Sequence, residues 1–259
     1  MFTRRTFLQL LWAGALQCAC CAVLPSSRAA QQGALRIALL HLSPQPGLLD
    51  VNWAQIEARV KQAAWHGADW VVTPELATSG YDFARVIGTR WIQPQPDVRM
   101  NRLARLAREA GVMIWLAAPE RDATSGKLYN SVFVLGADGA LLGRHRKIWV
   151  VQIPTEEWAS CGEQATPVQT PGLVIGNLIC ADAFDPTIAR RSKALGAQLF
   201  VSSAAWSPGE CGPDPYWVAL TKDTGLPLIV CNRTGQEGDF DFRFNRFVTA
   251  ENYHPIGVI

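Results

Sequence analysis

"NLICADAFDPTIAR", residues 177–190, is an apolar run that ends at Cys180 and changes at once to polar, proline-containing sequence. A short apolar run of this kind predicts a buried strand. Asp185 followed by Pro186 predicts the start of a helix, because aspartate caps helix N-termini and proline fits the first helical position. Gly196 predicts the end of that helix. The stretch therefore predicts a strand, a turn and a helix in succession, with Cys180 at the carboxyl end of the strand.

The same alternation of short apolar runs and amphipathic segments continues along most of the chain. Apolar residues at helical spacing predict helices within residues 53–68, 100–112 and 216–226. Asp50 or Asn52 is expected to cap the first of them. Apolar runs predict strands at residues 35–42, 69–76, 113–120, 198–206 and 227–232, and an Asp-Gly turn predicts a hairpin at residues 129–147. Strands that alternate with helices predict an α/β layered fold.

The composition is that of a globular protein. The chain has 259 residues, of which 49% are hydrophobic and 18% charged, which suits one sizeable domain or two small ones. The net charge of +2 provides no basic field of the kind that binds nucleic acid. No CxxC pair and no Cys/His cluster has the spacing of metal ligands, so a zinc site is not expected.

Residues 1–29 are typical of an export signal. Arg4 and Arg5 precede an apolar run from Phe7 to Leu24, which a stretch of small residues ends. The pair resembles a twin-arginine signal, which predicts that the twin-arginine export machinery carries the folded protein to a bacterial periplasm. An ordinary secretory signal and an uncleaved anchor are alternatives. An oxidising compartment would permit two disulfides among the remaining cysteines, Cys161, Cys180, Cys211 and Cys231.

Three residues with reactive side chains lie at the ends of predicted strands or of the predicted hairpin. They are Glu75, Lys147 and Cys180. A lone cysteine at a strand end is more often a packed core residue than a nucleophile. However, three segments in this order, "VVTPELATSGY", "GRHRK" and "LICADAFDPTIAR", resemble the nitrilase, or carbon–nitrogen hydrolase, superfamily. Supporting marks are "YNS" at residues 129–131, "SSAAW" at residues 202–206 and "CNRTG" at residues 231–235.

The resemblance implies a four-layer α-β-β-α sandwich over residues 35–259, commonly paired as a homodimer. It also implies a hydrolase of non-peptide carbon–nitrogen bonds that uses no metal or organic cofactor. Cys180 would attack a small amide or N-carbamoyl compound, Glu75 would move the proton, and Lys147 would favour the thiolate and face the oxyanion. Water would then hydrolyse a thioester on the enzyme. Nitrilase and acyltransferase activities occur in the same superfamily and are alternatives.

Further residues are candidates for supporting roles. Glu156 is expected to be a second glutamate of the site, although a one-residue shift in the alignment would select Glu157. The backbone N–H of Ala181, directly after the nucleophile, is a candidate oxyanion donor. Tyr81 and Trp206 either line the substrate pocket or pack in the core.

Two departures from the family pattern affect what the resemblance implies. Thr187 stands where the family usually has glutamate, so Arg190 is expected to pair with a different acid. From about residue 239 the sequence no longer follows the family, and two final strands are expected to be absent or replaced. A catalytically silent exported scaffold, which keeps the fold for binding, is therefore a further alternative.

Overall fold

The structure, a computed structural model, describes residues 35–208 and 214–243. Within these residues the helices are α1 (Leu49–Trp65), α2 (Phe83–Ile87), α3 (Val98–Ala110), the 3-10 helix η1 (Cys180–Phe184), α4 (Pro186–Ala194) and α5 (Asp214–Thr224). The strands are β1 (Ile37–Leu39), β2 (Trp70–Val72), β3 (Met113–Arg121), β4 (Leu128–Leu135), β5 (Leu141–Arg146), β6 (Val168–Thr170), β7 (Leu173–Ile179), β8 (Leu199–Ala204), β9 (Leu228–Asn232), β10 (Gln236–Glu237) and β11 (Phe240–Asp241). The predicted export signal and the atypical sequence beyond residue 243 lie outside the described part. No described helix is long and apolar enough to cross a membrane.

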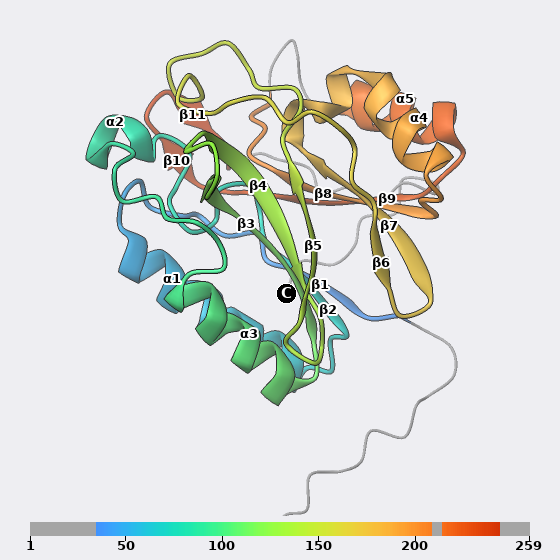
Figure 1. Ribbon diagram of the computed structural model, residues 1–259, viewed down its shortest axis with the longest axis horizontal. Coiled ribbons are helices and arrows are strands. Elements are labelled where there is room, and N and C mark those ends of the chain that lie inside the picture. The colour runs from blue at the N-terminus through green and yellow to red at the C-terminus, as the bar shows by residue number, and fades with distance from the viewer. Residues whose placement is uncertain (1–34, 209–213, 244–259) are drawn as a thin grey trace, which may run out of the picture. The chain divides into compact units, whose positions relative to one another are not determined.

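Two sheets carry most of the strands (Figure 1). The larger sheet has the order β1-β2-β3-β4-β5, in which β1, β2 and β3 are parallel and β4 is antiparallel to both of its neighbours. The smaller sheet has the order β6-β7-β8-β9, in which β7, β8 and β9 are parallel and β6 is antiparallel to β7. β10 and β11 form a separate antiparallel pair. The predicted α/β class is confirmed, and so is the β4–β5 hairpin.

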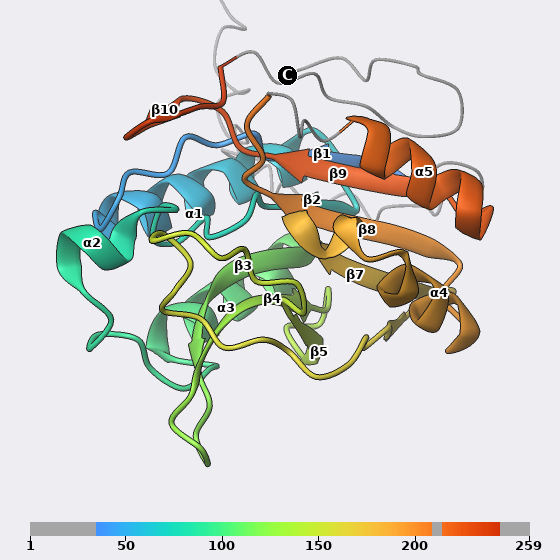
Figure 2. The ribbon, with the colours of Figure 1, turned by 90° about the horizontal axis from the view of Figure 1, so that it is seen from above.

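Apolar side chains pack against both faces of the larger sheet. One cluster joins this sheet to α1 and α3, and it includes Ile56, Leu103 and Ile114. A second cluster joins the two sheets, and it includes Trp115 of β3 and Leu178 of β7. In Figure 2, α1 and α3 lie beside the larger sheet and α4 and α5 beside the smaller one. Each sheet is therefore covered by helices, and the two sheets share a core that is removed from water.

Helix α4 begins where the sequence predicts. Oδ1 of Asp185 accepts a hydrogen bond from the N–H of Thr187 at 2.8 Å, and Pro186 occupies the first turn. The cap fixes the chain's entry into the helix. Between β7 and this cap only the short η1 turn remains, and its first residue is Cys180.

Helix α1 begins earlier than the sequence predicts, at Leu49. Neither Asp50 nor Asn52 caps it, so that prediction is wrong. The reason is a competing contact, because Asn52 is buried and its side chain forms hydrogen bonds of 2.8 Å with both the N–H and the carbonyl of Gln45. This asparagine ties the helix to the preceding loop.

Candidate active site

The candidate site lies where four strands end. Glu75 follows β2, Lys147 follows β5, Cys180 follows β7 and Ala205 follows β8. The first two strands belong to the larger sheet and the last two to the smaller sheet. The carboxyl ends of parallel strands are where α/β proteins gather ligands. The N–H of Glu75 donates to the carbonyl of Ala204 at 3.3 Å, so the strand ends of the two sheets meet directly.

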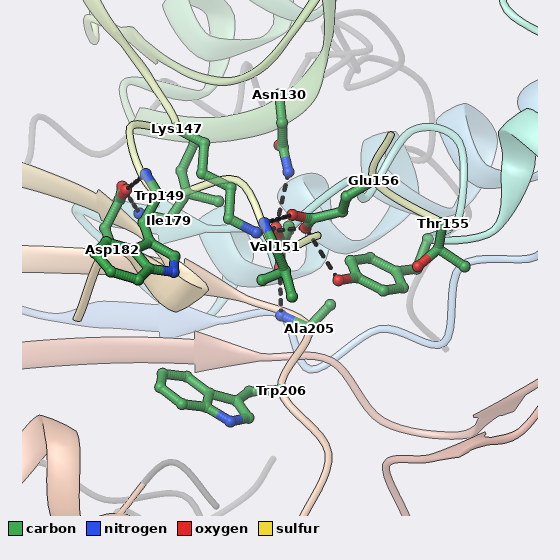
Figure 3. A network of polar contacts seen from close by, with 12 residues as sticks. Asn130, Lys147, Trp149, Val151, Thr155, Glu156, Ile179, Asp182, Ala205 and Trp206 are labelled. Carbon is green, nitrogen blue, oxygen red and sulfur yellow. Dashed lines mark hydrogen bonds and ion pairs between the residues drawn. The ribbon is translucent and has the colours of Figure 1, made fainter. Parts of the chain in front are cut away.

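Lys147 joins two carboxylates in the buried centre of the site (Figure 3). Its Nζ lies 2.8 Å from Oε1 of Glu75 and also forms an ion pair with Oε1 of Glu156. All three side chains are fully buried. Glu75 accepts two further hydrogen bonds, from Nδ2 of Asn130 at 2.7 Å and from the N–H of Ala205 at 2.9 Å. Donors from three segments of the chain thus fix the carboxylate of Glu75.

Glu156 is the glutamate that the structure places in the site, whereas Glu157 is exposed. Oε1 of Glu156 accepts a hydrogen bond from the hydroxyl of Tyr81 at 3.0 Å, and Oε2 accepts one from the N–H of Val151 at 2.8 Å. Gly80 directly precedes Tyr81 and has a φ of 80°, and a Cβ at residue 80 would come within 2.7 Å of neighbouring backbone. Glycine is therefore needed at residue 80 for the backbone to reach the position of Tyr81. The Gly-Tyr pair of the sequence motif therefore serves to bring a phenol to Glu156.

Cys180 has a strained backbone. Its φ is 45°, in the left-handed region that residues other than glycine rarely adopt. Such strain costs on the order of 1–3 kcal/mol and gathers at functional sites. Leu76, directly after Glu75, also has a positive φ, of 51°. The N–H of Ala205 donates to the carboxylate of Glu75 at 2.9 Å, and the backbone of Ala205 also lowers the pKa of the Cys180 thiol slightly, so both side chains face this residue.

Burial and the negative charges of the site control its proton affinities. Burial and the carboxylate of Glu75 raise the pKa of the Cys180 thiol well above its usual value, and Lys147 offsets only part of this rise. Burial, with a contribution from Glu156, also raises the pKa of Glu75, although Lys147 opposes it. Burial disfavours the ammonium of Lys147, but both glutamates outweigh burial and raise its pKa. Lys147 thus favours the thiolate, while burial and the carboxylate of Glu75 oppose it more strongly.

The remaining predicted residues lie around η1. Ala181 is buried in η1, directly after the cysteine. Trp206 is buried, and its ring centroid lies 4.9 Å from that of Phe184 and 5.6 Å from that of Tyr216. Trp149, whose ring centroid lies 6.3 Å from that of Phe184, is 45% exposed. Together Trp149, Phe184, Trp206 and Tyr216 form an aromatic cluster beside the turn that presents the thiol.

Two contacts of the site cannot be read from the sequence. Asn130, which donates to Glu75, carries no sequence signal beyond its place in the "YNS" mark. His145 has no recognisable partner in the sequence, yet its Nε2 lies 2.9 Å from Oδ2 of Asp182, and both side chains are fully buried. Burial of a polar group in this way requires a partner, which the fold supplies from a distant segment.

The cysteines and acids of the described residues show no metal site. No group of three or more His, Cys, Asp or Glu within the described ranges is arranged to hold a metal ion. Cys161 is an exposed free thiol, and Cys180 and Cys231 are buried free thiols. Cys211 lies outside the described residues.

Arg190 has a partner despite the threonine at position 187. Its guanidinium forms two hydrogen bonds with Asp223 of α5, at 2.7 and 2.8 Å. This pair joins α4 to α5 at an exposed position, where water screens the interaction and its contribution to stability is small.

Sequence comparison places the chain among known proteins. The family profile of carbon-nitrogen hydrolases matches residues 36–257. The chain belongs to the carbon-nitrogen hydrolase family. An omega-amidase of Xenopus tropicalis is 34% identical over 180 residues, which are 64% of this chain and 62% of that protein. A nitrilase of Pyrococcus abyssi is 31% identical over 173 residues, 66% of this chain and 64% of that protein. These matches span less than two thirds of the length of either relative.

Solved structures share the fold. An amidase from Nesterenkonia sp. is similar with a TM-score of 0.71 and 25% identity, over 80% of this chain and 79% of that chain. Nit3 of Saccharomyces cerevisiae, a member of the nitrilase superfamily, has a TM-score of 0.73 and 21% identity, over 83% of this chain and 81% of that chain. The resemblance to the nitrilase superfamily drawn from the motifs is confirmed.

Proposed function

We propose that the protein is an amidase that hydrolyses a small amide or N-carbamoyl compound through a thioester on Cys180. The observation that carries this proposal is the ammonium of Lys147, buried between Glu75 and Glu156 and near enough to the free thiol of Cys180, on its strained backbone, for the two to interact electrostatically. Family membership and similarity to an omega-amidase and an amidase support it. A buried ion pair contributes little net stability compared with well-packed apolar residues of similar volume, and a chemical role for this one is consistent with that.

In the proposed acylation step, Glu75 takes the thiol proton as the sulfur of Cys180 attacks the carbonyl carbon of the amide. The raised pKa of Glu75 makes it a stronger base than an exposed glutamate. The ammonium of Lys147 and the N–H of Ala181 stabilise the oxyanion that forms. The proton then passes from Glu75 to the leaving nitrogen, so that ammonia or an amine departs and a thioester remains.

In the proposed deacylation step, Glu75 takes a proton from a water molecule whose oxygen attacks the thioester carbon. The carbon–sulfur bond breaks, the proton returns to the sulfur, and the carboxylic acid leaves. Glu156 keeps Lys147 charged and oriented through both steps, and the hydroxyl of Tyr81 holds Glu156 in turn. Tyr81 therefore supports the cation in this scheme rather than forming an apolar wall.

The aromatic cluster suggests the kind of acyl group. Trp149, Phe184 and Tyr216 are each partly exposed beside the thiol's turn, and Trp206 packs behind them. Aromatic faces bury apolar groups favourably and make directional contacts with other rings. We therefore expect amides with an apolar or aromatic acyl group to be hydrolysed faster than the smallest amides.

Ammonia release by the purified protein tests the proposal. The substrates are aliphatic and aromatic amides, N-carbamoyl amino acids and nitriles. We expect amide turnover that falls by at least about 1,000-fold in Cys180→Ala. Cys231→Ala is the matched control, since Cys231 is also a buried free thiol, and it should keep turnover within about twofold. Acid quenching during turnover should leave the mass of the acyl group on Cys180.

The same experiment separates the alternatives. Full turnover in Cys180→Ala would overturn the thioester mechanism. Turnover of nitriles without amides would indicate a nitrilase, and trapping of the acyl group by added amines faster than by water would indicate an acyltransferase. A folded protein that releases no ammonia and gains no adduct would favour the silent scaffold.

Export and self-association are also part of the proposal. Arg4 and Arg5 support carriage by the twin-arginine machinery to a bacterial periplasm, and the family resemblance supports a homodimer. Cell fractionation and light scattering measure the two. Retention of the protein in the cytoplasm would contradict the first, and a monomer at micromolar concentration would contradict the second.

A further inference from the structure

A buried carboxylate outside the proposed catalytic set connects two segments of the site. Asp182 accepts four hydrogen bonds, each 2.9 Å long. Its Oδ1 accepts from the N–H groups of Ile148 and Trp149, of which Figure 3 shows Trp149. Its Oδ2 accepts from the N–H of Ile179 and from Nε2 of His145. An ionised carboxylate has about four acceptor positions, so those of Asp182 are filled.

The donors belong to the segments that carry the proposed ammonium and thiol. Ile148 directly follows Lys147, and Ile179 directly precedes Cys180. The hydrogen bond between Ile179 and Asp182 closes the turn around Cys180, whose φ of 45° is unfavourable for that residue type. One carboxylate thereby fixes the backbone beside the ammonium and the backbone beside the thiol to the same point.

His145 completes this arrangement from β5. The side chains of His145 and Asp182 are both fully buried. Burial alone would raise the pKa of Asp182, but the hydrogen bonds from His145 and from the backbone of Trp149 and Ile179 outweigh it and lower that pKa. Because three backbone N–H groups donate to Asp182, we assign Nε2 of His145 as the donor in the bond between the two side chains.

We propose that Asp182, held by His145, is a positioning residue that sets the place of the Cys180 thiol relative to the Lys147 ammonium. This inference rests on the proposed function, but it concerns a pair that makes and breaks no bond in the reaction. A displacement of about 1 Å at a reacting centre can lower a rate by two orders of magnitude. Loss of the pair should therefore act on kcat far more than on KM.

Asp182→Asn tests this proposal, with Asp185→Asn as the matched control. The asparagine keeps an oxygen for Ile148 and Trp149 but places an NH2 group against the N–H of Ile179. We expect kcat to fall at least about tenfold while KM changes by less than about threefold. Asp185→Asn makes the same chemical change three residues away, at a helix N-cap that asparagine serves equally well, and should change neither constant. Equal kcat values in the two variants would overturn the proposal.

Two variants of His145 keep the test decisive if Asp182→Asn does not fold. His145→Gln retains a donor at the position of Nε2 and should keep at least about half of kcat, whereas His145→Leu removes the donor and should lower kcat about tenfold. Far-UV circular dichroism and Tm establish that each variant is folded. A folded His145→Leu protein with the kcat of His145→Gln would overturn the proposal.

Alkylation of Cys180 by iodoacetamide provides a readout that needs no known substrate. The measurement uses a Cys161→Ala background, because Cys161 is an exposed thiol. We expect the His145→Leu variant to react about tenfold more slowly than the parent and the His145→Gln variant to react like the parent. If the parent hydrolyses no amide, the proposed function fails while this order still tests the positioning. Equal rates in all three proteins would overturn it.

Discussion

Arg146 and Lys147 are adjacent in the sequence, yet they enter two ion-pair clusters of different character. The Lys147 cluster consists of Glu75, Lys147 and Glu156, and all of its side chains are fully buried. The Arg146 cluster consists of Glu120, Asp122, Arg144 and Arg146. In the latter only the side chain of Glu120 is fully buried, and the other three are 20–44% exposed. Alternation of side chains at the end of β5 sends the two cations to opposite faces.

The Arg146 cluster has the features of a structural network. Nε of Arg146 lies 3.0 Å from Oε2 of Glu120, and its Nη2 lies 2.7 Å from Oδ2 of Asp122. The guanidinium also lies 3.9 Å from the ring centroid of Tyr129. These contacts join β3, β4 and β5 where Lys147 leaves the sheet. Water reaches most of the groups, so each pair contributes modestly and the network acts mainly on strand register.

The Lys147 cluster differs because burial removes that screening. Two carboxylates share one ammonium, so negative charge is in excess. Burial and this excess raise the pKa of Glu75 and of the Cys180 thiol. The comparison teaches that burial separates a cation that can stabilise a developing negative charge from a cation that holds strands together.

Removal of each cation should give the largest difference. Lys147→Met leaves the carboxylates of Glu75 and Glu156 buried against each other. We expect loss of turnover and a decrease of about 3–5 kcal/mol in the free energy of unfolding. Arg146→Met leaves Glu120 paired with Arg144 and leaves Asp122, which is 20% exposed, in contact with water, so we expect a decrease of about 1 kcal/mol and turnover within about threefold of the parent. Urea denaturation and ammonia release measure the two effects, and equal loss of activity in both variants would break the comparison.

Removal of one carboxylate from each cluster should give a smaller effect, which falls on kcat in the Lys147 cluster and on Tm in the Arg146 cluster. Glu75→Gln removes the proposed base and should lower kcat about 10²–10⁴-fold. Lys147 keeps Glu156 as its partner, so Tm should change little. Glu120→Gln should lower Tm, because both arginines of its cluster pair with that carboxylate, while kcat stays within about threefold. Initial rates and thermal melts test this difference, and a Glu120→Gln protein as slow as Glu75→Gln would contradict it.

The two clusters should also differ in the pH dependence of the property that each controls, and this is the smallest of the three expected effects. The raised pKa of Glu75 predicts that kcat/KM falls about tenfold per pH unit on an acid limb above pH 4.5, the usual glutamate value, because protonated Glu75 cannot accept the thiol proton. The pKa of Asp122 is lowered by hydrogen bonds from Ser125 and Arg146. Its stabilising effect is therefore present above its usual pKa of 3.8 and is lost as the pH falls below that value.

Rates and Tm measured from pH 3 to pH 8 would resolve the two limbs. We expect activity to be lost at a higher pH than the small decrease in Tm. An activity limb at or below pH 4.5 would show that Glu75 has an ordinary pKa and would remove the distinction between the clusters.

Residues that follow strands are open to prediction from the sequence, because apolar runs locate the strand ends. Glu75 and Cys180 lie at the ends of such runs, Lys147 lies at the end of the hairpin that the Asp-Gly turn marks, and the α/β alternation implies that these ends meet. Asp185 and its following proline likewise locate α4, since a cap acts on its own neighbours. Asn52 shows the limit of such reasoning, because the loop before α1 takes its side chain away from the cap position.

The partners of these residues are beyond the reach of sequence patterns. Asn130 and Glu75 are 55 residues apart, and His145 and Asp182 are 37 apart. Which polar groups face each other depends on how two sheets pack, and no local pattern records that. The proton affinity of the thiol is a similar case, since "RHRK" shows a cation nearby but not the burial that outweighs it.

The proposed base and nucleophile come from different sheets, and a seam of hydrogen bonds holds the sheets in register. Nε1 of Trp115 donates to Oδ1 of Asn177 at 2.9 Å, and Oγ of Ser203 donates to the carbonyl of Thr73 at 2.8 Å. If this seam slipped by a fraction of an ångström, every helix and strand would survive while acid and sulfur drew apart. Catalytic activity should therefore detect a shift of this seam that spectroscopy does not. On warming, the protein should lose activity at a temperature below its Tm.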